Sequence, residues 1–299
     1  MKKHSNDREV IHVTVIGLLW NLGLCIFKIL AGIVGNSQAV LADGFHSFSD
    51  IGSDLAVIMG AKFWSEPADQ QHPYGHGRLE EIVSLGIGLL LAAVGCGIVV
   101  SALWTLRAGR PSTPGWIAAA AAAVSLITKE ALYHWTLHRG CAAGSSALKA
   151  NAWHHRSDAL SSAPALAAVV GAKLFPEWWL LDPIGGIVVS ILILHAAWDI
   201  GVGAVQSLID RAAPARDIDR IRELVLRVEG VERVHAIRTR SLGQGWSVDL
   251  HVLVNEDLTV REGHNIAEKV HDLLIESGPA IEDTVVHIEP ADHETDSKE

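Results

Sequence analysis

Two pairs of histidine and aspartate share one spacing in the sequence. His46 and Asp50 are four residues apart, and so are His154 and Asp158. Because residues i and i+4 lie on one face of an α-helix, each pair can present an imidazole and a carboxylate to the same ion. Two imidazoles and two carboxylates match the tetrahedral preference of Zn²⁺, whereas oxygen ligands alone favour Mg²⁺, Ca²⁺ or Mn²⁺ and thiolates favour Cu(I). The pattern predicts a site for a divalent transition metal, and Fe²⁺, Co²⁺ and Cd²⁺ are also compatible with these ligands.

The elements that hold the two pairs are long apolar segments. The chain has a mean hydropathy of +0.27, and 49% of its residues are hydrophobic against 19% charged, which is too apolar for an ordinary soluble protein of this length. A bilayer core needs about 20 apolar residues per helix, and six segments qualify: 12–35, 38–62, 82–106, 115–138, 147–173 and 183–208. We therefore predict a six-helix, all-α transmembrane domain whose second and fifth helices carry the metal ligands.

Other ionisable residues also lie at the depth of the bilayer, where charge is costly and each such residue is a functional candidate. Asp43 and Asp54 share the helical face of the first pair, and we expect them to line the ion path or to accept hydrogen bonds from neighbouring helices. His155 is off the ligand face beside His154, so an entry or structural role is expected. Snorkelling or ion pairing explains three further charged residues without any function: Lys28, Lys129 and Glu130.

The loops between the apolar segments carry an asymmetric charge. Basic residues flank one set of ends: Lys2, Lys3, Arg8, Arg78, Arg139, Lys149 and Arg211. The positive-inside rule places these ends in the cytoplasm, although Arg107 and Arg110 fall on the opposite side. An even number of spans then puts both termini in the cytoplasm, and we predict a multi-pass protein of the plasma (inner) membrane.

After residue 211 the sequence changes to a soluble, acidic type. The chain has a net charge of −10, almost all of which comes from residues 212–299. A helix is expected near 216–229, strands near 231–241 and 246–254, a helix near 259–277 and a strand near 283–289, an order typical of a small α+β sandwich. We predict a transmembrane domain over residues 1–211 and a soluble domain over 212–299. The acidic surface argues against nucleic-acid binding, which needs basic residues.

Several motifs in register resemble the cation diffusion facilitator family over nearly the whole chain. They occupy residues 41–43, 46–50, 67–78, 154–158 and 206–210. The resemblance implies six transmembrane helices, a ferredoxin-like α+β cytoplasmic domain at the C-terminus, a homodimer and metal/proton antiport. The transport site of zinc-transporting relatives is similar to the two pairs found here, while the segment 154–158 looks like that of relatives assigned to iron or manganese.

The resemblance also implies further metal sites and a charge pair. Asp69, His72 and His76 match a second metal site in a loop, although three solvated polar residues would give the same pattern. Five residues of the cytoplasmic domain match positions that bind metal at the dimer interface: His235, His251, His264, His287 and Glu289. Glu289 stands where a close relative has aspartate, and Asp249 could substitute or assist. Arg78 and Asp210 match an interlock between helices, or form a local ion pair at the helix ends.

From these features we expect a transporter and not an enzyme. It exports a divalent cation in exchange for protons, with Zn²⁺ favoured, Fe²⁺ next, and Cd²⁺, Co²⁺ and Mn²⁺ possible. Zn²⁺ or Fe²⁺ then serves as the transported and the regulatory ion. The alternative is a non-transporting metal sensor or assembly partner with the same fold. An intramembrane metal enzyme is disfavoured because the sequence lacks HExxH and a GxS nucleophile.

Overall fold

The computed structural model describes residues 2–63, 68–109, 113–142, 146–242 and 245–291. The chain divides into two compact units, Met1–Val57 with Ser84–Gly201 and Ile58–Val83 with Val202–Glu299. The predicted domain boundary between residues 211 and 212 stays a prediction.

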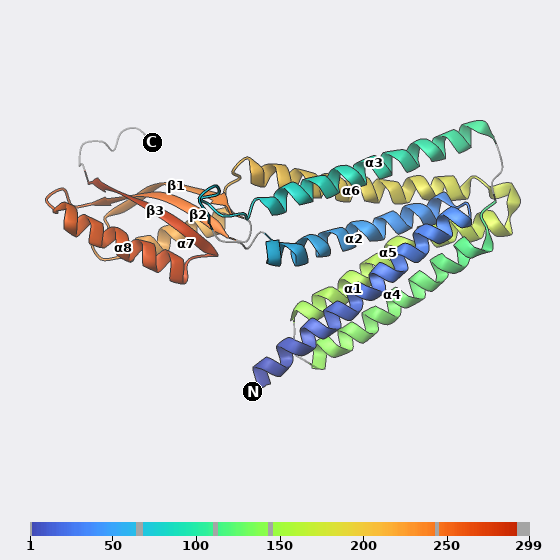
Figure 1. Cartoon of the computed structure of the whole chain (residues 1–299), viewed down its shortest axis with the longest axis horizontal. Helices are drawn as coiled ribbons and strands as arrows, with labels where there is room; N and C mark the ends of the chain where they lie inside the picture. The colour runs from blue at the N-terminus through green and yellow to red at the C-terminus, as the bar shows by residue number, and fades with distance from the viewer. Residues whose placement is uncertain (1, 64–67, 110–112, 143–145, 243–244, 292–299) are drawn as a thin grey trace. The chain divides into compact units, whose positions relative to one another are not determined.

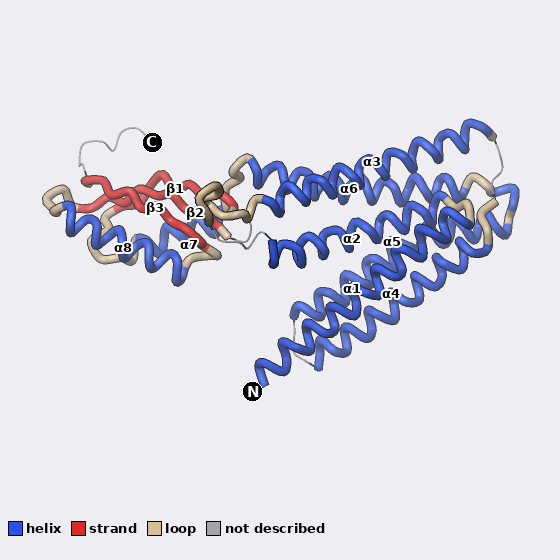
Figure 2. The backbone as a smooth tube through the Cα atoms, in the orientation of Figure 1, coloured by secondary structure: helices blue, strands red, loops and turns tan. Residues whose placement is uncertain are grey.

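Six long helices make up the apolar part of the chain (Figures 1 and 2). They are α1 (Lys2–Val34), α2 (Gln38–Phe63), α3 (Leu79–Ala108), α4 (Trp116–Ala142), α5 (Ser146–Leu174) and α6 (Leu181–Leu208), with a short 3₁₀ helix η1 (Pro176–Trp178) before α6. They confirm the six predicted helical segments, and α1 begins ten residues earlier than its apolar run. Within the described residues, four helices are apolar and long enough to cross a membrane: α1 from Val13, α3, α4 and the segment Pro176–Leu208. The two others, α2 and α5, carry the paired histidines and aspartates.

Small residues allow the helices of the first unit to pack closely. Its core is formed largely by alanine and valine, including Ala39, Val40 and Ala42 of α2 and Ala165 and Val169 of α5. Helices α1, α4 and α5 lie side by side (Figure 1). A Cβ atom at Gly44 would lie 2.7 Å from Ile29 Cγ1, so this glycine lets α1 and α2 approach each other. Close approach of this kind is typical of membrane helices.

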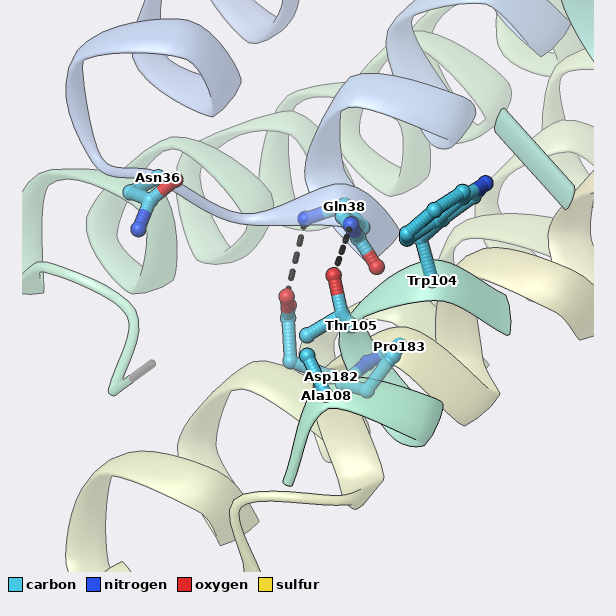
Figure 3. Close-up of a pocket in the computed structure, with 7 residues that line it drawn as sticks. All are labelled: Asn36, Gln38, Trp104, Thr105, Ala108, Asp182 and Pro183. Carbon is cyan, nitrogen blue, oxygen red and sulfur yellow. Dashed lines mark hydrogen bonds between the residues drawn. The ribbon is translucent and has the colours of Figure 1, made fainter. Parts of the chain in front are cut away.

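A carboxylate from α6 caps the start of α2. Asp182 Oδ1 accepts a hydrogen bond from Ser37 Oγ at 2.6 Å, and Asp182 Oδ2 accepts one from the backbone N–H of Gln38 at 2.8 Å. Gln38 and Asp182 border a pocket of about 340 Å³ that Thr105 and Trp104 of α3 also line (Figure 3). The first turn of a helix leaves N–H groups without intrahelical partners, so Asp182 satisfies donors that would otherwise be unpaired.

The C-terminal part of the second unit has the predicted order of elements. It contains α7 (Ala215–Val225), β1 (Arg233–Ser241), β2 (Trp246–Val254), α8 (Val260–Ser277) and β3 (Ile281–Pro290). The first helix ends at Val225 instead of near 229, because turns lead into Gly230, whose φ of +94° a side chain disfavours. The helix α8 begins with a capping box between Thr259 and Glu262.

The three described strands form one sheet in the order β1-β2-β3. Strand β2 pairs antiparallel with β1 and parallel with β3, and His251 lies opposite both His235 and His287. Helices α7 and α8 pack on one face of the sheet, where Val248, Leu250 and other apolar residues of β2 form a core with them. Since side chains alternate along a strand, His251 points to the other face.

A β-bulge interrupts the pairing of β1 with β2. The register shifts by one residue between His235 and Arg238, and Ala236 in the bulge has a φ of +49°. Beyond the bulge, Thr239 is buried and its Oγ1 accepts a hydrogen bond from the backbone N–H of Ala213 at 2.7 Å. The bulge therefore reverses, between the two parts of β1, which positions point to each face of the sheet.

Candidate metal centre

The pair on α5 forms the better described half of the predicted transport site. His154 Nδ1 lies 3.8 Å from Asp158 Oδ1 one helical turn away. Asp158 is buried, whereas the imidazole of His154 is about half exposed. Asp158 Oδ2 is buried and accepts no hydrogen bond from the described residues. The site therefore includes a buried carboxylate oxygen with coordinating capacity to spare.

The pair on α2 is described only in part. His46 is partly buried, and its Nδ1 has no hydrogen-bond partner among the residues described. The side chain of Asp50 lies outside the described part, as does that of Asp54. The ligand atoms of His46, His154 and Asp158 do not all lie within 4.8 Å of one another. The four-ligand site therefore stays a prediction.

A buried network of lysines and carboxylates lies between the helices that carry the site. Lys28 Nζ of α1 donates hydrogen bonds to Asp43 Oδ2 at 2.9 Å and to Ser47 Oγ at 2.6 Å. Asp43 Oδ1 accepts a further bond from Ser162 Oγ of α5 at 2.7 Å. The expectations that Lys28 is ion-paired and that Asp43 accepts bonds from neighbouring helices are confirmed.

A second buried lysine, Lys129 of α4, reaches the predicted metal ligand itself. Its Nζ lies 3.4 Å from Asp158 Oδ2 and 3.3 Å from Ser47 Oγ. Sequence reasoning assigned this lysine no function, although a charge inside an apolar segment is a signal in its own right. Its neighbour Glu130 lies 3.4 Å from His134 at the more exposed side of α4.

His155 is buried against α1 and takes no part in these contacts. Neither ring nitrogen has a hydrogen-bond partner among the described residues. A Cβ atom at Gly17 would lie 3.3 Å from His155 Nε2. The position agrees with the expectation that His155 is off the ligand face.

The loop before α3 brings together Asp69, His72 and His76, whose ligand atoms all lie within 4.8 Å. Asp69 Oδ1 is 3.3 Å from His72 Nδ1, and Asp69 Oδ2 is 3.6 Å from His76 Nε2. Asp69 Oδ1 also accepts hydrogen bonds from the backbone N–H groups of His72 and Gln71. These bonds, the one from His72 above all, lower the pKa of the Asp69 carboxyl. The cluster therefore offers an ionised carboxylate beside two imidazoles.

A second compact cluster lies on the sheet of the C-terminal part. Glu289 Oε2 is 2.8 Å from His235 Nε2, and Glu289 Oε1 is 2.8 Å from His251 Nδ1. His287 Nε2 is 3.4 Å from the same Oε1 atom. The hydrogen bond with His235, followed by that with His251, lowers the pKa of the Glu289 carboxyl. The ligand atoms of His235, His251 and Glu289 all lie within 4.8 Å and form a set that can hold one ion.

Two other predicted cytoplasmic ligands do not join this cluster within the chain. His264 lies on α8, where its exposed ring is 3.4 Å from Glu268. Asp249 lies opposite Arg238 and Val285 in the sheet register. His264 is on α8, which packs on the face of the sheet opposite to His251. The spacing of these residues along the sequence does not reveal that separation.

Arg78 and Asp210 form an ion pair with a hydrogen bond within one chain. Asp210 has a φ of +61° at the end of α6. A second contact nearby joins Ser207 Oγ of α6 to Glu81 Oε1 of α3 at 2.6 Å. The local ion pair is thus observed, whereas a dimer role stays a prediction.

Comparison with known proteins covers both parts of the chain. Residues 14–209 match the cation efflux transmembrane domain, and residues 213–291 match the cytoplasmic domain of cation efflux proteins. Metal tolerance protein C1 of Arabidopsis thaliana is 34% identical over 95% of this chain and 65% of its own length. The chain thus spans slightly less than two thirds of that relative.

Two bacterial relatives are matched over more of their own length. The manganese efflux system protein MneP of Bacillus subtilis is 30% identical over 96% of this chain and 98% of its own. The magnetosome protein MamM of Paramagnetospirillum magneticum is 31% identical over 85% of this chain and 80% of its own.

Proposed function

The chain belongs to the cation diffusion facilitator family of multi-pass membrane proteins, and from this premise we propose that it exports a divalent transition-metal ion in exchange for protons. The proposed transport ligands are His46, Asp50, His154 and Asp158. The observation that carries the proposal is the buried Asp158 carboxylate, which lies one turn from His154 and whose Oδ2 lacks a hydrogen bond among the described residues. Among those residues its charge is balanced by the 3.4 Å ion pair with Lys129, which makes no hydrogen bond to it, so the carboxylate keeps oxygen lone pairs that a metal ion can use.

The ligand set favours a borderline metal. Imidazole nitrogen and carboxylate oxygen together suit Zn²⁺ best and Fe²⁺ next. Two relatives are named for manganese efflux, MneP and MneS of Bacillus subtilis. Manganese therefore belongs in every comparison of substrates, together with Cd²⁺ and Co²⁺.

Proton exchange follows from the chemistry of the ligands. A neutral imidazole binds a metal ion and an imidazolium does not, so protons and metal compete for His46 and His154. An unperturbed histidine has a pKa of about 6.5, close to the pH of a cytoplasm. Protons entering the site from outside thus favour release of the ion there.

We further propose that the protein is a homodimer in the plasma membrane. Both termini of each chain then lie in the cytoplasm. The basic residues at the helix ends support this orientation. The loop cluster at Asp69 and the sheet cluster at Glu289 are then exposed to cytoplasmic metal, and we assign them a regulatory role. Arg78 and Asp210 would hold α3 and α6 together at the cytoplasmic ends during transport.

Flux measurements in proteoliposomes test this function. The purified chain is reconstituted, and uptake of Zn²⁺, Fe²⁺, Mn²⁺, Co²⁺ and Cd²⁺ is compared with and without an imposed pH gradient. We expect saturable transport that the pH gradient accelerates in one direction only. Metal binding without flux would identify the alternative function of a sensor or assembly partner, and flux indifferent to a pH gradient of either sign would refute proton exchange.

A further inference from the structure

Two lysines lie fully inside the helical unit, and their surroundings differ. Lys28 of α1 and Lys129 of α4 each expose no more than 2% of the side chain. A buried ammonium group must be compensated by acceptors or a counter-charge, because removing it from water is energetically costly. The way in which each lysine is compensated therefore indicates what it does.

Lys28 is held firmly by three oxygen atoms. Its ammonium donates to Asp43 Oδ2 at 2.9 Å, to the backbone carbonyl of Asp43 at 3.1 Å and to Ser47 Oγ at 2.6 Å. The three donors of the ammonium group thus have three acceptors. Lys28 is a fixed brace between α1 and α2.

Among the described residues, two oxygen atoms contact the ammonium group of Lys129, and both contacts are long. The 3.4 Å contact with Asp158 Oδ2 is an ion pair without a hydrogen bond, and the contact with Ser47 Oγ is 3.3 Å. Ser47 Oγ already accepts the shorter bond from Lys28, so two ammonium groups share one hydroxyl and repel each other. Lys129 can leave Asp158 at a smaller cost than Lys28 can leave Asp43.

We infer that Lys129 is a tethered counter-ion that neutralises Asp158 when no metal is bound and is displaced when the metal arrives. This inference rests on the proposed transport function. A divalent ion on the Asp158 carboxylate and an ammonium group within 3.4 Å of it repel each other strongly at low dielectric. The two cations therefore exclude each other from this carboxylate.

The displaced lysine has another place on its own helix. Ser125 lies one turn before Lys129 on α4, and its buried Oγ has no hydrogen-bond partner among the described residues. Helical side chains lean toward the N-terminus of their helix, so the ammonium group of Lys129 can turn to this side. The ammonium group of Lys129 can also keep its contact with Ser47 Oγ.

The competition has a consequence for transport. Without Lys129, release of the metal would leave the Asp158 carboxylate uncompensated at the depth of the membrane. With Lys129, an internal cation replaces the metal as it leaves. Lys129 is therefore a positioning residue that weakens metal binding and accelerates release.

Substitution of the two lysines separates this role from that of a structural brace. In Lys129→Met, an apolar chain of similar length removes the charge, and Lys28→Met is the matched control because its partner Asp43 is not a proposed ligand. Zn²⁺ binding to the full-length dimer is measured by competition with a fluorescent chelator. His76→Ala and His251→Ala are present in every sample to remove the other two clusters.

We expect Lys129→Met to lower the Kd for Zn²⁺ about tenfold or more and to lower both KM and kcat of flux, since release becomes slower. Lys28→Met should change the Kd much less than Lys129→Met does, because Lys28 is paired with Asp43 and makes no contact with Asp158 among the described residues. Lys129→Arg keeps a charge whose planar fork binds carboxylates more firmly, so its Kd should rise. If Lys129 only held α4 and α5 together, no variant would bind Zn²⁺ more tightly than the parent.

The outcomes distinguish this inference from the proposed function. If the parent protein transports metal and Lys129→Met binds Zn²⁺ no more tightly than the parent, the counter-ion role is wrong and the transport function stands. If Lys129→Met does not form a dimer, an unchanged or lower Kd in Lys129→Arg overturns the inference, whereas a higher Kd supports it. If the parent neither binds nor transports any metal, the proposed function fails first.

Discussion

Asp182 accepts a hydrogen bond from the backbone N–H of Gln38 at 2.8 Å, across 144 residues of sequence. The first turn of α6 thereby fixes the start of α2, the helix that carries His46. We predict that Asp182→Ala destabilises the folded protein by about 1–2 kcal/mol, the usual cost of a lost helix cap. Thermal unfolding in detergent should shift down by a few degrees. The control is Asp199→Ala on the same helix, which removes only an exposed contact with His195 and should not shift the transition.

The proposed transport ligands are tested by removal of a single donor group. Asp158→Ala and His154→Ala should each abolish metal flux, because the proposed site loses one of its four ligands. The oligomeric state should match that of the wild type by size-exclusion chromatography. His134→Ala removes an exposed imidazole on α4 that contacts Glu130 and should transport normally. Flux near the wild-type rate in either ligand variant would remove that residue from the site.

The identity of the first ligand should control selectivity. In His46→Asp an oxygen donor replaces a nitrogen donor, which favours harder cations. We expect the ratio of Mn²⁺ to Zn²⁺ flux to rise several-fold while transport persists. The measurement is initial uptake of each ion under one pH gradient. An unchanged ratio would contradict a direct contact between His46 and the ion.

The Glu289 cluster can be tested with two histidines, His251 inside the cluster and His264 outside it. Addition of Zn²⁺ should raise the unfolding temperature of the full chain, since a ligand that binds only the folded state stabilises it. His251→Ala should reduce this rise because His251 contacts Glu289 at 2.8 Å. His264→Ala should leave it unchanged because that ring contacts Glu268 instead. The same comparison in the Asp158→Ala background excludes effects from the transport site. Equal losses in both variants would place His264 in the site.

The Glu289 carboxylate makes the sheet sensitive to acid. Its folded-state pKa is lowered by its bonds to His235 and His251, so its stabilising effect is complete above the ordinary glutamate pKa and is lost as the pH falls through the lower folded value. With a chelator present, amide hydrogen exchange in β2 and β3 should be faster in Glu289→Gln than in the wild type at pH 7. This difference should shrink as the pH falls below about 4. If the difference in exchange between Glu289→Gln and the wild type grew on acidification, ionised Glu289 would not be the stabilising form.

The sequence predicted the elements well because their signals are local. About twenty apolar residues define a membrane helix, and alternating apolar and polar residues, as in 246–252, are typical of a strand with one buried face. The ligand spacing in 154–158 likewise requires only one helix. By contrast, the contact of Lys129 with Asp158 depends on how α4 packs on α5, and the separation of His264 from the Glu289 cluster within one chain depends on which face of the sheet α8 covers. Neither follows from spacing along one segment.

The bulge at Ala236 gives β1 a change of phase. In a regular strand, residues 235 and 239 would point to the same side. Here His235 points to the Glu289 cluster, and Thr239 is buried where it accepts the hydrogen bond from Ala213. Deletion of Ala236 would force the strand to keep only one of these two contacts in place. The inserted residue therefore lets a single short strand carry a metal ligand at one end and an anchor for the chain that enters the domain at the other.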